Sequence, residues 1–347
     1  MPGALQRPAV VSRMSDLIGY TPLLQLATTE TGSRLLLKLE MFNPTGTAKI
    51  RMARAMIDAA EAAGELRTGG RIIESTSGNT GLGLSVIAAE RGYTFTAVVD
   101  GHAAADKLRA MKALGAELVR VDADGDGGEL HTAAREELAE NMARNEDNTV
   151  FTEQHNNPAN SFGYFPVAHE LAEALDGRLD ILIGAVGTGG GLCGTGRELA
   201  TLIGDFTTIG VEPKGSVAFG GPAHDYHQSG TGTPEGAEIG ALVDFDLIDE
   251  GVKVGDIEAF ATCRAVARTG LLIGGSAGGV VHEALTRLPA LPPGTTMVAL
   301  INDGGEKYMD TVFNDDWMAE HHLLSPEVER EVDEHLTKLR RNPMTPC

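Results

Sequence analysis

A single lysine stands at the start of a predicted helix in the stretch NPTGTAKIRM, which begins at Asn43. Thr47 is the expected N-cap, so Lys49 falls in the first turn, where the helix dipole repels a cation. Because a free lysine has a pKa of about 10.4, its neutral amine is scarce at pH 7 by roughly three orders of magnitude. Making the amine half-neutral costs about 4–5 kcal/mol, and the dipole supplies only about 0.3–1 kcal/mol.

Desolvation or a covalent bond must therefore supply the remainder at Lys49. A Schiff base with an aldehyde cofactor would do so, and lysine is the side chain that proteins use for this bond. The stretch indicates a cofactor-bonding lysine, with an ordinary surface lysine beside a helix cap as the alternative.

A glycine-rich turn, GAVGTGGGLCGTG (Gly184 to Gly196), follows an apolar strand and opens another helix. Backbone N–H groups in such a turn can converge on an anion at the positive helix N-terminus, so we expect phosphate binding here. A merely tight strand–helix turn is the alternative. The same turn contains Gly189-x-Gly191-x-x-Gly194, and Glu212 ends the next strand, a pattern that is also typical of a dinucleotide site whose acidic residue holds a ribose.

A second polar glycine turn, ESTSGNTGLG (Glu74 to Gly83), also follows a strand and opens a helix. An ordinary helix cap needs one polar side chain, whereas this turn offers four, which suit a carboxylate: Thr76, Ser77, Asn79 and Thr80. A reactive lysine, a phosphate cradle and a carboxylate turn are the parts that a pyridoxal 5′-phosphate (PLP) enzyme needs. An NAD site leaves Lys49 and this turn without a purpose.

Sheets must position these turns. Short β-rich runs recur, most of them continuously apolar as in strands buried on both faces: RLLLKLE, RIIES, FTAVVD, ELVRVD, TVFTE, ILIGAVG, TIGVE, LLIGG and TMVALIND. Helical patterns lie between them, at 49–66, 81–91, 106–114, 131–145 and 167–175. The alternation predicts an α/β fold with parallel, doubly wound sheets, and the strands fall into two groups, before and after the polar stretch ARNEDNT.

Two further turns, GGSAGG and NDGGEKY, are also expected at the carboxyl ends of strands, where all four turns can line one crevice.

Composition narrows the class of protein. The chain has 347 residues, 42% of them hydrophobic, which predicts a substantial core and two domains. A formal net charge of −21 argues against nucleic acid and anionic membranes as partners. The three cysteines, Cys193, Cys263 and Cys347, form no Cys-x-x-Cys and predict a reducing compartment. We expect a cytoplasmic protein without a signal peptide, a membrane span or a metal site.

The order and spacing of six motifs resemble the cysteine synthase and cystathionine β-synthase group of fold type II PLP enzymes: NPTGTAKIR, ESTSGNTGLG, EQHNNPAN, GAVGTGGGLCG, GGSAGG and NDGGEKY. The resemblance covers about Asp16 to Trp317. It implies a homodimer and two doubly wound domains, with the active site in the cleft between them. The larger, PLP-binding domain would comprise residues 1–42 and 155–324, and the smaller, mobile domain residues 43–154.

Residues 325–347 are expected to form a C-terminal helical tail. Ser325 can cap this helix and Pro326 suits its first position. The helix would carry one apolar stripe: Val328, Val332, Leu336 and Leu339. The stripe either packs on its own domain or makes a subunit contact.

The resemblance assigns Lys49 as the Schiff-base lysine and the general base, and Asn79 as the partner of the phenolic oxygen of PLP. It assigns the phosphate cradle to Gly187, Thr188, Gly189, Gly190 and Gly191. It assigns the substrate carboxylate to Thr76, Ser77, Gly78, Thr80 and Gln154. Ser276 would face the pyridine nitrogen, and a neutral hydroxyl there leaves the ring a weaker electron sink, which suits elimination and replacement at the β-carbon.

Several positions depart from the cysteine synthase pattern. Gly191 replaces the usual last threonine of the cradle, SFGYFPVAHEL follows NNPAN, and the loop GAEIGALV introduces Glu238. The motif EPKGSVAFGG, with NDGGEKYMDTVFNDDW, looks closer to the branch that makes N-(2-amino-2-carboxyethyl)-L-glutamate, a precursor of 2,3-diaminopropionate, from O-phosphoserine and glutamate. In that motif, Lys214 would bind either the leaving phosphate or the carboxylate of the incoming glutamate.

The implied reaction is a β-replacement on an O-activated L-serine, O-phosphoserine or O-acetylserine, through an aminoacrylate intermediate. Its small-molecule substrates are amino acids, and its product is N-(2-amino-2-carboxyethyl)-L-glutamate or, alternatively, L-cysteine made from sulfide. Two other classes of protein stay open at this point. One is an NAD-binding Rossmann enzyme, and the other is a catalytically silent PLP-fold protein that serves as a binding partner.

Overall fold

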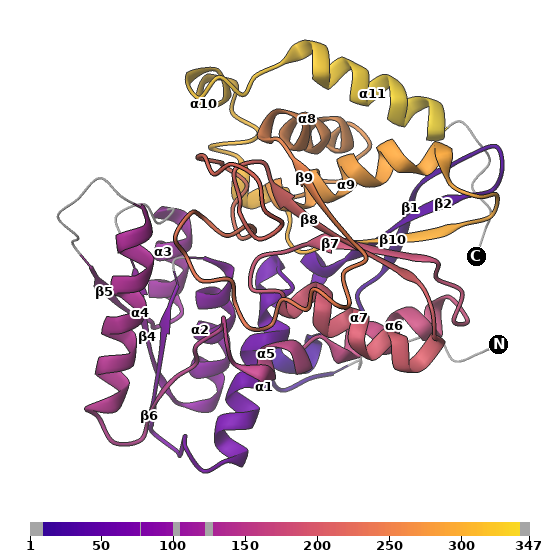
Figure 1. Ribbon diagram of the computed structural model, residues 1–347. Coiled ribbons are helices and arrows are strands. Elements are labelled where there is room, and N and C mark those ends of the chain that lie inside the picture. Colours follow the sequence, from indigo (N-terminus) through magenta and orange to yellow (C-terminus); the bar gives the residue numbers. More distant parts are fainter. Residues whose placement is uncertain (1–9, 77, 100–104, 122–127, 341–347) are drawn as a thin grey trace.

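The computed structural model describes residues 10–76, 78–99, 105–121 and 128–340, and Figure 1 shows two groups of elements, each built around its own sheet. Within 128–133 only the backbone is described. Among the described helices, none combines the length and the apolar character that a membrane span requires.

The larger sheet has six strands in the order β1-β2-β10-β7-β8-β9. Only the β1–β2 pair is antiparallel, and the other four pairs are parallel. The strands are β1 (Leu23–Thr28), β2 (Arg34–Leu39), β10 (Thr296–Ile301), β7 (Ile181–Ala185), β8 (Thr207–Pro213) and β9 (Glu250–Val254). Helices cover both faces, which explains why the central strands read as continuous apolar runs.

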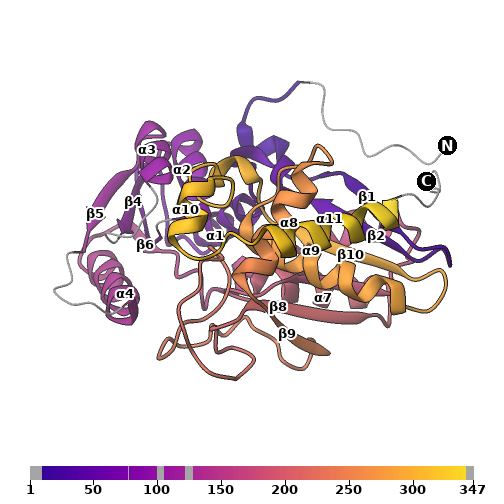
Figure 2. The ribbon, with the colours of Figure 1, turned by 90° about the horizontal axis from the view of Figure 1, so that it is seen from above.

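Figures 1 and 2 show three helices over one face of this sheet: α8 (Asp256–Ala267), α9 (Gly275–Arg287) and α11 (Pro326–Arg340). Two helices lie below the other face, α6 (Phe165–Ala174) and α7 (Gly190–Ile203). The short α5 (Pro158–Phe162) and α10 (Asp315–Glu320) complete this part of the molecule. In α11, Val332, Leu336 and Leu339 are buried, so the apolar stripe of the tail packs on its own chain.

The smaller sheet has four parallel strands in the order β5-β4-β3-β6. They are β5 (Glu117–Arg120), β4 (Thr94–Val99), β3 (Arg71–Ser75) and β6 (Thr149–Phe151). Four helices accompany this sheet: α1 (Lys49–Ala62), α2 (Asn79–Arg91), α3 (Ala105–Ala113) and α4 (Gly128–Arg144). Ile73 and Val98 pack against α4, whereas the alternate residues Ile72 and Ala97 face the core that α1 and α2 share.

The predicted α/β class and parallel sheets are confirmed, and all five predicted helices are present. Grouping the strands before and after ARNEDNT is wrong. The strand in RLLLKLE (β2) lies in the larger sheet, and the strand in TVFTE (β6) pairs with β3, because the crossover helix α4 packs across the smaller sheet and returns the chain beside it. The run LLIGG is not a strand either. Ile273 forms only an isolated bridge with Gly304, since Gly274 already caps α9.

Candidate active site

Lys49 is the first residue of α1, directly after a short 3₁₀ turn, η3 (Pro44–Gly46). The N-cap position of α1 is Ala48 and not the predicted Thr47, although the backbone N–H of Lys49 does donate to the hydroxyl oxygen of Thr47 at 3.3 Å. Thr47 forms an isolated backbone bridge with Asp303, and the N–H of Ala48 donates to the carbonyl of Asn302 at 2.8 Å. The loop that follows β10 therefore holds the segment in front of the lysine.

Burial lowers the pKa of the Lys49 ammonium to about 8, and the carboxylate of Asp303 opposes this shift. At pH 7 roughly a tenth of the amine is then neutral, compared with about one part in a thousand for a free lysine. Desolvation therefore supplies most of the pKa lowering that a reactive Lys49 requires, and the helix dipole contributes less. Within the described residues, the ammonium of Lys49 makes no hydrogen bond.

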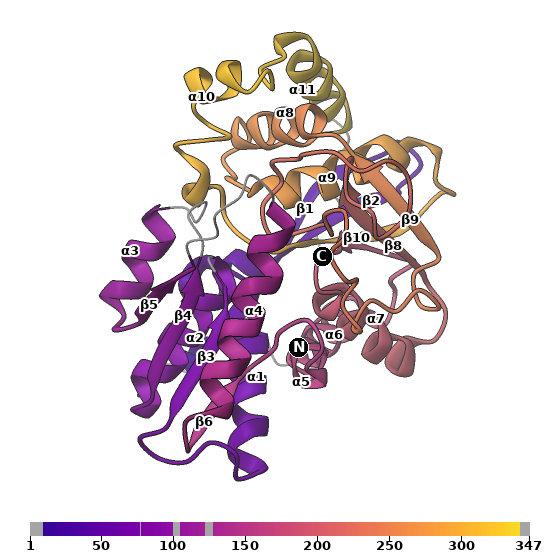
Figure 3. The same ribbon diagram turned by 60° about the vertical axis from the view of Figure 1, so that its left-hand side comes forward.

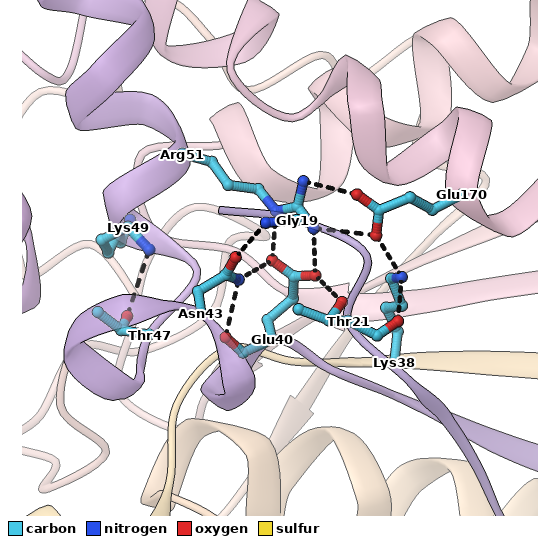
Figure 4. A network of polar contacts seen from close by, with 9 residues as sticks. All are labelled: Gly19, Thr21, Lys38, Glu40, Asn43, Thr47, Lys49, Arg51 and Glu170. Carbon is cyan, nitrogen blue, oxygen red and sulfur yellow. Dashed lines mark hydrogen bonds and ion pairs between the residues drawn. The ribbon is translucent and has the colours of Figure 1, made fainter. Parts of the chain in front are cut away.

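A buried charge network fixes α1 behind Lys49 (Figure 4). The guanidinium of Arg51 binds Glu40 through Nε and Nη2, at 2.6 and 2.9 Å, and Glu170 through Nη1 and Nη2, at 2.9 and 3.0 Å. Lys38 adds a second cation, 2.5 Å from Glu170, and the side-chain exposure of all four residues is 6% or less. Two positive and two negative charges thus compensate each other inside the protein.

The same network extends to the turn in front of Lys49. The amide of Asn43 donates to Glu40 Oε2 at 2.8 Å and accepts from the backbone N–H of Gly19 at 2.8 Å, while the hydroxyl of Thr21 donates to Glu40 Oε1 at 2.6 Å. These contacts join the first turns of α1 to β2, to α6 and to residues before β1. The position of Lys49 is therefore set from the larger sheet.

The predicted phosphate cradle lies at the carboxyl end of β7, where α7 begins. One small cavity is lined by Lys49, by four of the five cradle residues and by neighbouring groups: Gly187, Thr188, Gly189, Gly191, Tyr164, Ala185, Gly230 and Asn302. Gly189 has a φ of 87°, and a β-carbon there would collide with the backbone of Val243. A β-carbon at Gly190, which does not line the cavity, would collide with the side chain of Asn160. The structure thus brings Lys49 and the glycine turn together.

The donors of this cavity fit a phosphate-bearing aldehyde. The first N–H groups of α7 have no partner within the helix, and Lys49 supplies the amine. The cavity measures about 20 Å³, enough for one water molecule, so a bound ring requires its walls to move apart.

The predicted carboxylate turn connects β3 to α2. The hydroxyl of Thr80 donates to Gln154 Oε1 at 2.8 Å, so two of its predicted members lie side by side. Thr76 Oγ1 accepts from the N–H groups of Gly78 and Gly81, at 3.3 and 3.2 Å, and so caps the turn itself. Ser77 lies outside the described residues. Any role of these groups toward a substrate carboxylate stays a prediction.

The two residues predicted to hold the cofactor ring lie at helix N-termini. Asn79 begins α2, and its amide binds Asp303 and Lys307. Ser276 is buried at the start of α9, two residues after Gly274, whose N–H donates to the carbonyl of Asp303 at 3.2 Å. Asp303 therefore lies close to Lys49, to Asn79 and to the helix end that carries Ser276.

Of three other predicted or noted residues, Lys214 and Glu212 have partners of their own, and Glu238 lies near another acid. The ammonium of Lys214 lies 3.7 Å from a carboxylate oxygen of Glu258, and the Lys214 side chain is 56% exposed. Its predicted role in substrate binding gains no support from this contact and stays a prediction.

Glu212 is fully buried and binds Lys253, the hydroxyl of Ser216 and two backbone N–H groups, so its carboxylate is occupied and cannot hold a ribose. Glu238 lies near Glu136 of α4, whose pKa is raised mainly by burial and to a smaller extent by Glu238.

Two buried acids of this region, Asp303 and Glu74, were not predicted as site residues from the sequence. Asp303 is the second residue after β10, within the motif NDGGEKY, and Glu74 is the penultimate residue of β3. Burial raises the pKa of Glu74 to about 8, against hydrogen bonds from Thr152 and Gln154. An acidic residue that directly ends or follows an apolar strand was the available signal, because such a position is buried at the carboxyl edge of the sheet.

Comparisons with known proteins agree with this geometry. A family model described as "Pyridoxal-phosphate dependent enzyme" matches residues 14–303. A protein of Sinorhizobium fredii, named "Putative cysteine synthase", is 45% identical over 92% of this chain and 96% of its own. The N-(2-amino-2-carboxyethyl)-L-glutamate synthase of Ralstonia nicotianae is 35% identical over 89% of this chain and 92% of its own.

Among solved structures, a cysteine synthase from Entamoeba histolytica superposes with a TM-score of 0.83 at 27% identity, covering 97% of this chain and 98% of that one. The residues matched by the family model, 14–303, contain both sheets, Lys49 and the glycine turns at 74–83, 184–196 and 274–279. The chain therefore belongs to the pyridoxal-phosphate dependent enzyme family, within its cysteine synthase and cystathionine β-synthase group.

Proposed function

We propose that this protein catalyses the PLP-dependent replacement of the β-substituent of an O-activated L-serine, giving a β-substituted alanine. One observation carries the proposal: Lys49, with its pKa lowered to about 8 by burial, lines the same cavity as the glycine cradle at the start of α7. The cradle residues and Lys49 would hold the cofactor, with Asn79 and Ser276 at its ring. Bound PLP supplies an electron-withdrawing ring that stabilises negative charge at the α-carbon of an amino acid.

The residues of this chain then divide the remaining work. The turn from Thr76 to Thr80, with Gln154, would hold the α-carboxylate and so orient the substrate. The amine of Lys49 would remove the α-proton, for which a pKa near the operating pH is the favourable value. The leaving group would depart from the β-carbon with the bonding electron pair, and the nucleophile would bond to the same carbon. The Lys49 ammonium would then return its proton to the α-carbon, which completes the β-substituted alanine.

The relatives support two products. The N-(2-amino-2-carboxyethyl)-L-glutamate synthases of Ralstonia nicotianae and Cupriavidus metallidurans favour that product, formed from O-phosphoserine and L-glutamate. The relatives named as cysteine synthases in Sinorhizobium fredii and Bacillus subtilis favour L-cysteine, formed with sulfide. We expect the first product because of the EPKGSVAFGG motif and keep L-cysteine as the alternative.

Two measurements test the reaction class. The purified protein with PLP should show a visible absorption band, and borohydride reduction with peptide mapping should label Lys49. Lys49→Ala should abolish the label and collapse turnover. A label on Lys38 or Lys107 instead, or a protein that stays colourless with PLP, contradicts the assignment.

A panel of substrates tests the product. O-phosphoserine and O-acetylserine are each supplied with sulfide, thiosulfate, cyanide, cysteine, homocysteine or glutamate, and the products are identified by mass spectrometry. Formation of the glutamate adduct supports the first product, and turnover with sulfide alone supports the second. Lys214→Met should impair the reaction of O-phosphoserine and spare that of O-acetylserine if Lys214 binds the leaving phosphate.

We further propose a cytoplasmic homodimer in which the smaller domain, residues 43–154, moves against the larger one. The thiols of Cys193 and Cys263 are free and buried, which favours a reducing compartment. Light scattering of the purified protein tests the dimer, and fractionation of source cells tests the compartment.

A further inference from the structure

A chain of polar side chains joins the start of α2 to the loop after β10. Lys307, in the 3₁₀ turn η5 (Gly305–Tyr308), donates to Asn79 Oδ1 and to the carbonyl of Gly46, both at 3.0 Å. Asn79 Nδ2 donates to Asp303 Oδ2 at 2.8 Å, and the hydroxyl of Tyr308 donates to the same oxygen at 2.8 Å. Both ends of the Asn79 amide therefore have partners, 224 and 228 residues further along the chain.

The chemistry of these partners allows one orientation of the Asn79 amide. The ammonium of Lys307 can only donate hydrogen bonds, and an ionised carboxylate can only accept them. A flipped amide would set its NH₂ group against the ammonium and its oxygen against Asp303. Since one N–H of Asn79 Nδ2 is used by Asp303, the second N–H is the group that remains to be offered to a ligand.

Asp303 is itself fixed independently of Asn79. Its backbone bridges to Thr47 and accepts from the N–H of Gly274, and its side chain is 2% exposed. A β-carbon at position 274 would collide with Asp303 Oδ1, an atom that has no hydrogen-bond partner among the described residues. Burial lowers the pKa values of both Lys49 and Lys307, and the charge of Asp303 opposes both shifts, so this carboxylate lies near the two ammonium groups.

We propose that Asp303 and Lys307 are positioning residues that hold the Asn79 amide with an N–H directed to the phenolic oxygen of the cofactor. The inference rests on the proposed function, because Asn79 has this ligand only if the chain binds PLP. An anionic phenolic oxygen accepts hydrogen bonds, so the N–H binds it and a flipped amide would repel it. The two charged partners thus decide whether Asn79 assists or opposes cofactor binding.

A double-mutant cycle with a non-covalent probe tests this. The probe is 4′-deoxypyridoxine 5′-phosphate, which keeps the ring, the phenolic oxygen and the phosphate but cannot form the covalent bond to Lys49. Its Kd is measured by equilibrium dialysis for the parent, Asp303→Asn, Asn79→Ala and the double variant. Asp303→Asn replaces an obligate acceptor by an amide that can also donate, so one of the two contacts that exclude the flipped amide is lost.

We expect Asp303→Asn to raise the Kd of the probe about tenfold or more in the parent, and less than about twofold in the Asn79→Ala background. Lys307→Met should behave in the same way, because it removes the other of the two contacts that exclude the flipped amide. A merely structural role would weaken binding equally in both backgrounds. The exposed residues Asp310 and Lys338 provide matched controls, Asp310→Asn and Lys338→Met, which should leave the Kd unchanged.

Equal effects in the two backgrounds, or no effect in the parent, overturn the inference while the proposed function stands. A parent protein that does not bind the probe overturns both. If circular dichroism shows that Asp303→Asn does not fold, the Lys307→Met cycle decides by the same criteria.

Discussion

At the scale of single residues, Lys49 shows how burial makes an amine reactive at a cost in stability. Its pKa is lowered from 10.5 to about 8 in the folded protein, mainly by desolvation. Between these values the unfolded chain binds the proton and the folded chain does not. The charge on Lys49 therefore destabilises the folded state at neutral pH, and this penalty disappears as the pH rises from about 8 to 10.5.

Lys49→Met should stabilise the cofactor-free protein. We expect the free energy of unfolding to rise by about 3 kcal/mol at pH 7, from 1.36 kcal/mol per pKa unit, and the gain to shrink toward pH 10. Urea unfolding of the parent and the variant at both pH values measures the difference. Lys338→Met, on the exposed face of α11, should change neither value. An equal gain at pH 7 and pH 10 would show that the buried charge is not its origin.

Thr80→Val should impair catalysis, although valine keeps nearly the size and branching of the threonine side chain. The substitution removes the hydroxyl that binds Gln154 Oε1 and leaves this buried acceptor without its partner. Losing one hydrogen bond to a substrate carboxylate costs about 1.5–3 kcal/mol, so kcat/KM for the activated serine should fall roughly ten- to a hundredfold. The Kd of PLP should stay unchanged. Thr201→Val, exposed on α7, is the matched control, and an unaltered kcat/KM would exclude this turn from substrate binding.

At the scale of elements, the network around Arg51 joins α1 of the smaller sheet to β2 and α6 of the larger one. Burial alone would lower the pKa of Arg51, but Glu40 and then Glu170 raise it above its ordinary value. A buried charge set of this kind is costly to assemble, and costlier to break, because removing one member leaves another charge unpaired. The main effect of the network is therefore to fix the position at which α1 begins, rather than to increase the free energy of unfolding.

Arg51→Lys should destabilise the protein although it keeps the charge. One ammonium cannot form the four hydrogen bonds by which the guanidinium bridges Glu40 and Glu170, so a buried carboxylate loses its partner. We expect a loss of about 3–5 kcal/mol in urea unfolding. Arg54→Lys, one turn along the same helix, has a half-exposed partner and should cost less than about 1 kcal/mol. Similar losses for both variants would contradict a special role of the network.

At the scale of the whole molecule, the groups of the candidate site come from both sheets. Thr80 and Asn79 follow β3 of the smaller sheet, whereas the glycine cradle and Asp303 follow β7 and β10 of the larger one. Figure 3 shows the smaller sheet, with α3 and α4, beside the larger one and joined to it through the region of α1. Because the cavity at Lys49 is narrow, we propose that a relative movement of the two parts controls access to it.

Substrate binding should therefore shorten the distance between the two parts. Spin labels at Glu137→Cys in α4 and Asp316→Cys in α10, both exposed, report it by double electron–electron resonance in a Cys347→Ser background. The mean distance should decrease when an activated serine is added to the PLP-loaded protein. Labels at Glu320→Cys and Lys338→Cys, both beside the larger sheet, should not respond. An unchanged distance for the first pair would refute the mobile domain.

The sequence alone determined the parts that depend on neighbouring residues. Glycines, caps and a lysine at a helix start are local signals, because turn geometry and helix capping involve residues a few positions apart. The helix start at Lys49 and the strand–helix turns at 76–80 and 187–191 could be predicted for this reason, as could eight of the strands. The binding roles of these residues stay predictions. The parallel class followed from the alternation of strands and helices.

The tertiary structure decided which distant residues meet. The pairing of Asn79 with Asp303, of Arg51 with Glu170 and of β6 with β3 joins segments that no local pattern connects. In the folded chain Glu212 also pairs with Lys253, and Lys214 lies beside Glu258. The dinucleotide and phosphate patterns in the sequence could not reveal these partners. The sequence gives the charge and the hydrogen-bonding groups of each side chain. The burial of a side chain and its hydrogen-bond partners are established only when the chain folds, and burial and partners determine the chemistry of Lys49 and Asn79.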